Sequence, residues 1–205
     1  MPDLESGRMD TTTGAVSPGN PEGLALGSEE AARHVASGHA ATRRAGPPGF
    51  LRRLDELEAL LREAHAHVAS STDPKLGLSY AGEWLLDNFY TVNQAVRQVR
   101  QDLPPGFYRE LPKLDASAEH DLPRIYALAR ELTSSSEFTL DPDRMRRFVA
   151  AYQSVSPLTM GELWGLPTML RLATLERLAR AATALVDHAL GGATPLAGER
   201  RRQAA

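Results

Sequence analysis

One apolar spacing recurs along this sequence and limits its fold more than any other feature. From Phe50, apolar residues follow at intervals of four, three, four, three and four positions, and the same intervals recur from Leu85 to Leu103. This spacing places the apolar side chains on one face of an α-helix. No run of β-branched residues alternates with polar ones between turn signals, as strands require. The sequence therefore predicts an all-α fold.

The first two expected helices are bounded by prolines and by a capping residue. The first begins at Phe50 and ends before Pro74, because the residue preceding a proline is pushed out of helical geometry. The second begins after Ser79, whose hydroxyl can cap a helix, and ends at Leu103, where two prolines follow. Residues 107–114, beyond those prolines, are expected to be extended but packed.

Three further helices are expected in the second half of the chain. One covers residues 123–132, and the next begins with Asp141 as its N-cap. Thr159 and Glu162 form a capping-box pattern at the start of the last helix. Pro167 should kink that helix, because proline lacks the backbone N–H of an ordinary helical residue. We predict an irregular antiparallel bundle of about five helices.

The composition changes along the chain and suggests three regions. Residues 1–49 are dominated by Gly, Pro, Ser, Thr and Ala and contain no aromatic residue, so we predict a disordered leader. Within it, residues 28–37 could form a short helix. Residues 50–192 form the expected helical domain, and residues 193–205 a flexible tail.

Charge, hydropathy and cysteine content exclude several classes of function. The 23 Lys and Arg residues nearly balance the 26 Asp and Glu residues, so no basic surface for nucleic acid is expected. The chain has no cysteine, which excludes disulfides and thiolate metal sites. No apolar run approaches the ~20 residues of a membrane span, and no secretory signal is recognisable. These features are compatible with a reduced, cytoplasmic compartment.

The polar residues that draw attention lie on the second helix, in the loop after it and near the start of the last helix. They are Glu83, Trp84, Asp87, Asn88, Tyr108, Arg109, Glu110, Glu162, Trp164 and Arg171. Glu83 and Asp87 share a helix face, whereas glycosidase carboxyls usually face each other across a cleft. We expect most of the set to form a buried structural network of Arg109 with carboxylates, without a catalytic residue. The alternative is a sugar- or protein-binding surface with Trp84, Tyr108 or Trp164 as its platform.

Two other patterns superficially suggest metals. Glu63, His65 and His67 are close in sequence, but His65 points away from the face shared by the other two on a helix. Asp141 and Asp143 flank a proline directly before a helix, where this pattern is ordinary capping chemistry. We predict no metal site and no cofactor.

Four blocks of sequence resemble the N-terminal region of cyclic β-1,2-glucan synthases. They are EWLLDNFYTV (residues 83–92), QDLPPGFYRELPKL (101–114), PRIYALARELT (123–133) and RRFVAAYQSVSPLTMGELWGLPTMLRLATLERLARAA (146–182). The resemblance extends over about residues 50–190, with the blocks in the same order. Several blocks in sequence are more specific than one short motif.

The resemblance implies a large bacterial inner-membrane enzyme that builds and cyclises a β-1,2-glucan from UDP-glucose. In such enzymes the glycosyltransferase core, the membrane spans and the phosphorylase-like domains follow the region seen here. The resemblance therefore implies no catalytic residue in this chain. It suggests a helical, cytoplasmic N-terminal domain or fragment at the inner face of the membrane.

Three functional hypotheses follow. The first is a non-catalytic domain that docks on the glucosyltransferase part of the synthase. The second is a free-standing helical adaptor that binds another protein. The third is a small glucan-binding module. None of them involves nucleic acid or a membrane span in this chain.

Overall fold

The computed structural model describes residues 21–42, 49–73, 76, 79–114, 122–134 and 141–189. Its elements, in chain order, are α1 (Pro21–Gly38), β1 (Ala41–Thr42), α2 (Gly49–Ser70), α4 (Tyr80–Asp102), α5 (Pro105–Glu110), β2 (Lys113–Leu114), α6 (Arg124–Ser134), α7 (Pro142–Gln153) and α8 (Met160–Ala189). The predicted all-α bundle is confirmed. The expected tail of residues 193–205 lies outside the described residues.

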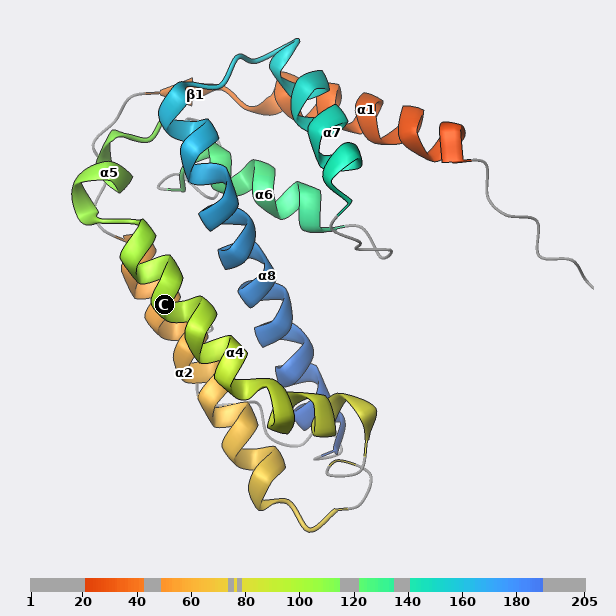
Figure 1. Cartoon of the computed structure of the whole chain (residues 1–205), viewed down its shortest axis with the longest axis vertical. Helices are drawn as coiled ribbons and strands as arrows, with labels where there is room; N and C mark the ends of the chain where they lie inside the picture. Colours follow the sequence, from red (N-terminus) through yellow and green to blue (C-terminus); the bar gives the residue numbers. More distant parts are fainter. Residues whose placement is uncertain are drawn as a thin grey trace, which may run out of the picture.

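Helix α8 is the central element of the bundle. It packs against α2, α4 and α6, and α2 and α4 also pack against each other. Figure 1 shows α4 running in the opposite direction to both α2 and α8. Helix α4 is therefore an antiparallel neighbour of α2 and α8, whereas α2 and α8 run in the same direction. Helix α8 continues through Pro167, and the kink expected there stays a prediction.

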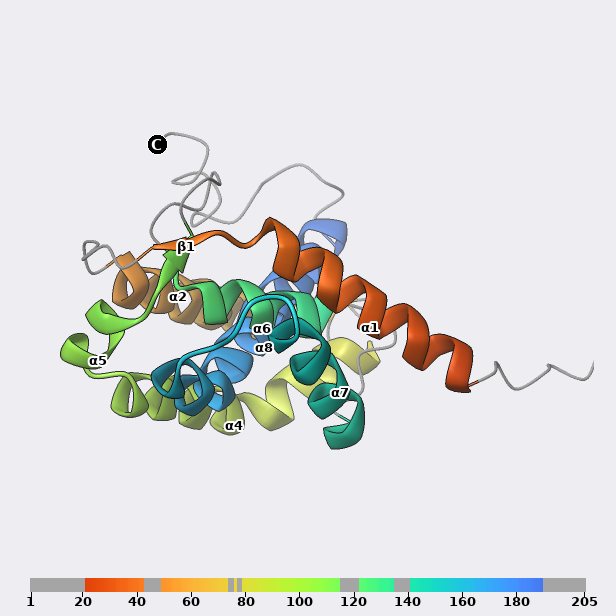
Figure 2. The same cartoon turned by 90° about the horizontal axis from the view of Figure 1, so that it is seen from above.

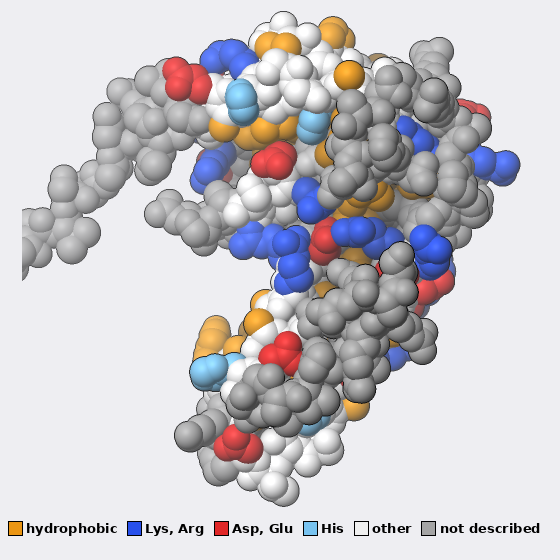
Figure 3. All heavy atoms as spheres, turned by 180° about the vertical axis from the view of Figure 1, so that it is seen from behind, with side chains coloured by type: hydrophobic (Ala, Val, Ile, Leu, Met, Phe, Trp, Pro, Cys, Tyr) orange, Lys and Arg blue, Asp and Glu red, His pale blue; other side chains and the backbone are white. Residues whose placement is uncertain are grey.

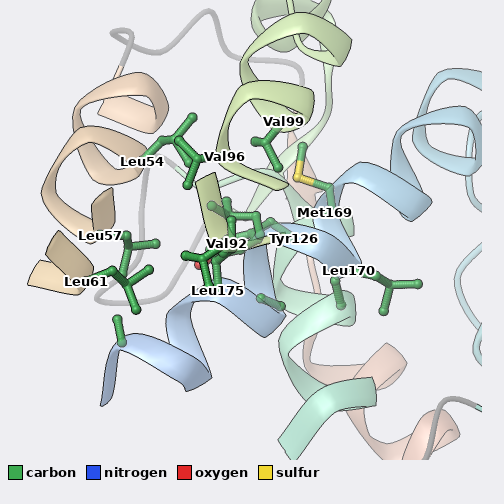
Figure 4. Packing of buried hydrophobic residues seen from close by; sticks show 14 of the residues in the cluster. Leu54, Leu57, Leu61, Val92, Val96, Val99, Tyr126, Met169, Leu170 and Leu175 are labelled. Carbon is green, nitrogen blue, oxygen red and sulfur yellow. The ribbon is translucent and has the colours of Figure 1, made fainter. Parts of the chain in front are cut away.

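The core is formed by the apolar stripes that the sequence spacing identifies. Figure 4 shows side chains of α2, α4, α6 and α8 gathered between these helices. The labelled core residues are Leu54, Leu57, Leu61, Val92, Val96, Val99, Tyr126, Met169, Leu170 and Leu175. Each fully buried leucine or valine contributes about 1.5–3 kcal/mol relative to an exposed one. Burial of these stripes therefore supplies the main driving force for the fold.

Predicted capping residues are confirmed at the starts of α4 and α7. The Ser79 hydroxyl accepts a hydrogen bond from the Gly82 amide at 3.0 Å. The Asp141 carboxylate accepts from the amides of Asp143 and Arg144 at the start of α7. Each cap satisfies amides that have no acceptor within the helix.

The prediction of a disordered leader is wrong for residues 21–42. This segment contains α1, which packs against α7, and Figure 2 shows the two helices beside each other. The face of α1 that is buried includes Ala32 and Ala36. A hydrogen bond of 3.0 Å also joins His39 Nδ1 to the Tyr152 hydroxyl. The helix expected over residues 28–37 is confirmed and is longer than predicted.

The segment after the second helix also differs from the prediction. Residues 105–110 form the short helix α5 rather than an extended segment, because Pro105 supplies the helical φ angle at its first turn. Lys113 and Leu114 are extended and pair with β1 in antiparallel fashion, so two short strands are present. Leu111 and the residues up to Leu114 are buried, which confirms that this segment is packed.

Candidate functional site

Within the part of the chain that the structure describes, the buried pair of Arg124 and Glu162 has an extensive set of hydrogen bonds. Arg124 Nε donates to Glu162 Oε1 at 2.9 Å, and Arg124 Nη2 donates to Glu162 Oε2 at 2.7 Å. The same guanidinium donates to Ser156 Oγ at 2.8 Å and to the Pro157 carbonyl at 2.9 Å. This arrangement ties the start of α6 to the α7–α8 connection and to the start of α8.

The capping box at the start of α8 is part of this network. The Glu162 carboxylate accepts from the Thr159 amide at 2.8 Å, while the Glu162 amide donates to the Thr159 hydroxyl at 3.3 Å. One carboxylate thus caps its own helix and binds Arg124 of another helix. Because Glu162 is fully buried, these hydrogen bonds compensate for the loss of its hydration.

A second buried polar cluster surrounds Glu176 in the middle of α8. Arg53 of α2 donates to Glu176 Oε1, and the Tyr126 hydroxyl of α6 donates to Glu176 Oε2 at 2.5 Å. Arg130 Nε and Arg180 Nη2 lie 3.6 and 3.9 Å from the same carboxylate. This cluster connects α2, α6 and α8 at one point.

Burial and neighbouring charges shift the pKa of the Glu176 carboxyl and the pKa of two buried tyrosines in opposite directions. Burial disfavours the charged form of Glu176, but the Tyr126 hydrogen bond and the Arg53 charge outweigh it, so the pKa of Glu176 is lowered. Burial raises the pKa of Tyr126 above its usual value and raises the pKa of Tyr152 to about 12. The carboxylate therefore stays ionised while both phenols stay neutral at neutral pH.

Lys113 is a buried cation beside the short helix α5. Its side chain is almost completely enclosed, and its ammonium group lies 4.7 Å from the centroid of the Tyr108 ring. An ammonium over an aromatic face is attracted by the negative face of the ring. Tyr108 is therefore a buried structural residue rather than an exposed platform for a ligand.

The predicted network on the second helix is wrong. The side chains of Glu83 and Asp87 are exposed on α4, so they take no part in a buried cluster. Asn88 Nδ2 donates to the Trp84 carbonyl at 2.9 Å, a bond within the same helix. Trp84 itself is 41% exposed. These side chains point outward because Val92 and the other buried residues of α4 occupy the face of the helix that is turned to the core.

The predicted role of Arg109 is also wrong. Arg109 and Glu110 are exposed on α5, and Arg124 is the residue that neutralises Glu162. Arg171 pairs with Asp102 at the end of α4 through a half-exposed contact of 3.3 Å. The ten predicted residues are therefore not brought together at one site. Among them, Glu162 belongs to the buried ion pair with Arg124.

The sequence reasoning missed the cationic partners of both clusters. Arg124 is the first residue of α6 and directly precedes a run of buried residues, Ile125 to Ala129. Glu176 and Arg53 lie within apolar stripes of α8 and α2, respectively. A charged residue at an inward position indicates a buried pair. Its partner, however, lies far away in sequence.

Neither buried cluster has the geometry of a catalytic centre. Each carboxylate pairs with an arginine from another helix, Glu162 with Arg124 and Glu176 with Arg53, so it serves to join helices. His65 stacks on the Phe89 ring, with the ring centroids 4.0 Å apart. Across the described residues, no group of three or more His, Cys, Asp or Glu side chains could hold a metal ion. None of the described helices is long and apolar enough to cross a membrane.

Exposed aromatic and methionine side chains of the described residues lie at two places on the surface. Met160 and Trp164, near the start of α8, are 63% and 74% exposed. Tyr80, Trp84 and Tyr90 are exposed on α4. Aromatic and methionine side chains are enriched at binding surfaces, so these are the candidate contact residues of the molecule.

Comparison with known proteins identifies a related sequence. No protein-family model matches the chain. A segment of 136 residues, 66% of the chain, is 35% identical to the cyclic beta-(1,2)-glucan synthase NdvB of Rhizobium meliloti (strain 1021). That segment spans only 5% of the length of the synthase. The predicted resemblance to cyclic glucan synthases is confirmed, and the chain is related to a small region of such an enzyme.

Proposed function

We propose that this chain is a non-catalytic helical domain of a cyclic β-1,2-glucan synthase, which docks on the glucosyltransferase part and supports glucan synthesis from UDP-glucose. The observation that carries the proposal is the similarity of most of this chain to a small part of a far longer synthase. In this proposal the domain acts at the cytoplasmic face of the bacterial inner membrane.

The arrangement of the charged groups supports a structural role for this domain. Glu162 and Glu176 are both enclosed by donors from neighbouring helices. Each carboxylate already accepts hydrogen bonds from side chains of the bundle itself. The internal polar groups therefore maintain the shape of the bundle, and contact with a partner depends on its outer surface.

The surface that suits docking best consists of Met160 and Trp164, which we call the Met160–Trp164 surface. Because the two residues stand four positions apart on α8, they share one face of the helix. A large exposed tryptophan beside a flexible methionine is typical of an interface anchor. Phe107 of α5 packs beneath this part of α8, against Gly161 and Gly165, and supports the helix from below.

The test is to supply the chain in trans to a cyclic glucan synthase that lacks the matching segment. Incorporation of glucose from UDP-glucose would be measured in membrane vesicles. We expect activity to depend on the chain and to fall in the Met160→Ser, Trp164→Ser double variant. A matched control is the Tyr80→Ser, Tyr90→Ser double variant, which removes exposed side chains elsewhere. Glucose transfer by the purified chain alone would contradict a non-catalytic role.

A glucan-binding module is the second candidate function, favoured by the exposure of both tryptophans. Trp84 and Trp164 could each stack on a sugar ring. This function predicts a saturable change in tryptophan fluorescence as β-1,2-glucan is added to the purified chain. An unchanged spectrum at high glucan concentration would leave docking as the better account of these residues.

A further inference from the structure

The first half of α4 carries an exposed tryptophan beside two exposed carboxylates. Trp84 is 41% exposed, and the side chains of Glu83 and Asp87 are exposed next to it. Tyr80 and Tyr90, 84% and 70% exposed, lie in the same part of the helix. Because an α-helix turns by about 100° per residue, all five side chains fall within a sector of about 120°. We call Glu83, Trp84 and Asp87 the Glu83–Asp87 surface.

The two carboxylates of this surface have no partner among the described residues. Neither side chain accepts a hydrogen bond or forms an ion pair with any residue that the structure describes. Glu83 lies in the first turn of α4, where a negative charge also stabilises the positive end of the helix dipole. Asp87 stands one turn further on, where that effect has faded. The stability of the helix therefore does not account for both carboxylates.

The surroundings of the Glu83–Asp87 surface are poor in positive charge. Figure 1 shows the first half of α4 beside the end of α8, with which α4 packs. Residues 63–96 contain four Asp and Glu residues against a single lysine, Lys75, and Arg97 is the first arginine of α4. On the face seen in Figure 3, Lys and Arg side chains gather across the middle and upper parts, whereas Asp, Glu and His side chains are visible toward the lower end. This end of the bundle therefore favours a cationic partner.

The spacing of these side chains suits a guanidinium group. Trp84 and Asp87 stand three positions apart, and Tyr80 stands four positions before Trp84, so they are neighbours on the helix surface. A guanidinium plane can stack on an aromatic ring, and its fork can donate two hydrogen bonds to one carboxylate. An ammonium group offers neither the plane nor the fork, since it is a compact, strongly hydrated charge. The surface should therefore distinguish arginine from lysine.

We propose that the Glu83–Asp87 surface docks an arginine-rich segment of a partner protein. Arginines of the partner stack on Trp84 and pair with Glu83 and Asp87. The Met160–Trp164 surface lies at the start of α8 and takes no part in this contact. The inference does not rest on the proposed docking role, because occupancy of α4 is not needed for glucose transfer, and either can fail without the other.

The experiment is calorimetric titration of the complete chain with a hexa-arginine peptide blocked at both ends, at constant ionic strength. We expect saturable binding that weakens on the order of tenfold or more in the Glu83→Gln, Asp87→Asn double variant. Trp84→Ser should also weaken binding, because it removes the ring on which a guanidinium stacks. A hexalysine peptide of equal charge should bind the wild type several-fold more weakly. Circular dichroism confirms that each variant is folded.

The matched control for charge is the Glu30→Gln, Glu110→Gln double variant, which removes two exposed carboxylates on α1 and α5. It changes the net charge of the chain by the same amount and should bind hexa-arginine like the wild type. Val155→Ser, at a residue that is 47% exposed, is the control for loss of an exposed apolar side chain.

The sequence itself contains a competing occupant, the consecutive Arg200, Arg201 and Arg202. If the Arg200→Gln, Arg201→Gln, Arg202→Gln variant binds hexa-arginine much more tightly than the wild type, the surface belongs to the chain's own arginines and the assignment to a partner is overturned. The proposal also fails if the wild type does not bind hexa-arginine, if hexalysine binds as tightly, or if the two double variants bind alike.

Discussion

Arg124 and Glu162 face each other in a two-pronged contact, with Nε 2.9 Å from Oε1 and Nη2 2.7 Å from Oε2. The pair joins the first residue of α6 to the first turn of α8 inside the protein. Because both side chains are buried, nearly all of their donors and acceptors need partners within the protein. Arg124 therefore also donates to Ser156 and to the Pro157 carbonyl, and Glu162 also accepts from Thr159.

Breaking this pair should destabilise the fold strongly. Arg124→Ala leaves the Glu162 carboxylate buried without its cation, which costs about 3–5 kcal/mol. For a domain of this size, we expect the midpoint of thermal unfolding to fall on the order of 10 °C. Thermal denaturation followed by circular dichroism measures the change. A loss below 1 kcal/mol would show that the pair contributes little.

Arg109→Ala is the matched control, because Arg109 is exposed on α5. We expect its free energy of unfolding to change by no more than about 0.5 kcal/mol. Comparing Arg109→Ala with Arg124→Ala thus distinguishes the network predicted from the sequence, which is centred on Arg109, from the network in the structure, which is centred on Arg124. A larger loss for Arg109→Ala than for Arg124→Ala would reverse that assignment.

The Glu176 cluster should contribute stability that is lost in acid. The pKa of Glu176 is lowered in the folded protein, so its contribution is present above the unfolded value of about 4.3 and disappears as pH falls through the folded pKa. Glu176→Gln should cost on the order of 3 kcal/mol at pH 7, because Arg53 loses its counter-charge. The difference in free energy of unfolding between Glu176→Gln and the wild type should shrink below pH 4. Urea denaturation across this pH range measures it, and a constant difference would contradict the expectation.

Gly82 should tolerate no side chain. A Cβ atom at this position would lie 2.2 Å from the Leu76 carbonyl oxygen, a backbone atom that cannot simply turn away. Gly82→Ala should therefore destabilise by about 1–3 kcal/mol. Gly106→Ala is the control, since nothing lies within 4 Å of the added atom. Equal unfolding midpoints for the two variants would show that the start of α4 can shift.

Local features of the fold could be predicted from the sequence, because their partners lie close in the chain. Ser79, Asp141 and Thr159 cap helices through residues two or three positions away. The apolar stripes likewise follow from helical periodicity. The full length and the packing of α1 escaped prediction because its buried residues include the small side chains of Ala32 and Ala36, which add little hydropathy to a polar segment.

The candidate site was predicted poorly because its contacts join distant helices. Arg124 meets Glu162 across 38 positions, and Arg53 meets Glu176 across 123. Nothing in the local pattern distinguishes Arg124 from the exposed Arg109. Only the packing of α6 and α2 against α8 determines which arginine reaches a buried carboxylate.

Alkaline pH should expose the contribution of Tyr152. Burial raises its pKa to about 12 in the folded protein, whereas an unfolded tyrosine titrates near 10. Its contribution is present below pH 10 and is lost as pH rises from 10 to 12, because the unfolded chain releases its proton first. Tyr152→Phe loses the hydrogen bond to His39, which costs on the order of 1 kcal/mol at neutral pH. The Tyr152→Phe variant has no phenol to deprotonate, so the difference in free energy of unfolding between it and the wild type should shrink above pH 10.

The control is Tyr90→Phe, which removes the phenol of an exposed tyrosine. A difference between wild type and Tyr152→Phe that stays constant up to pH 12 would contradict the raised pKa of Tyr152.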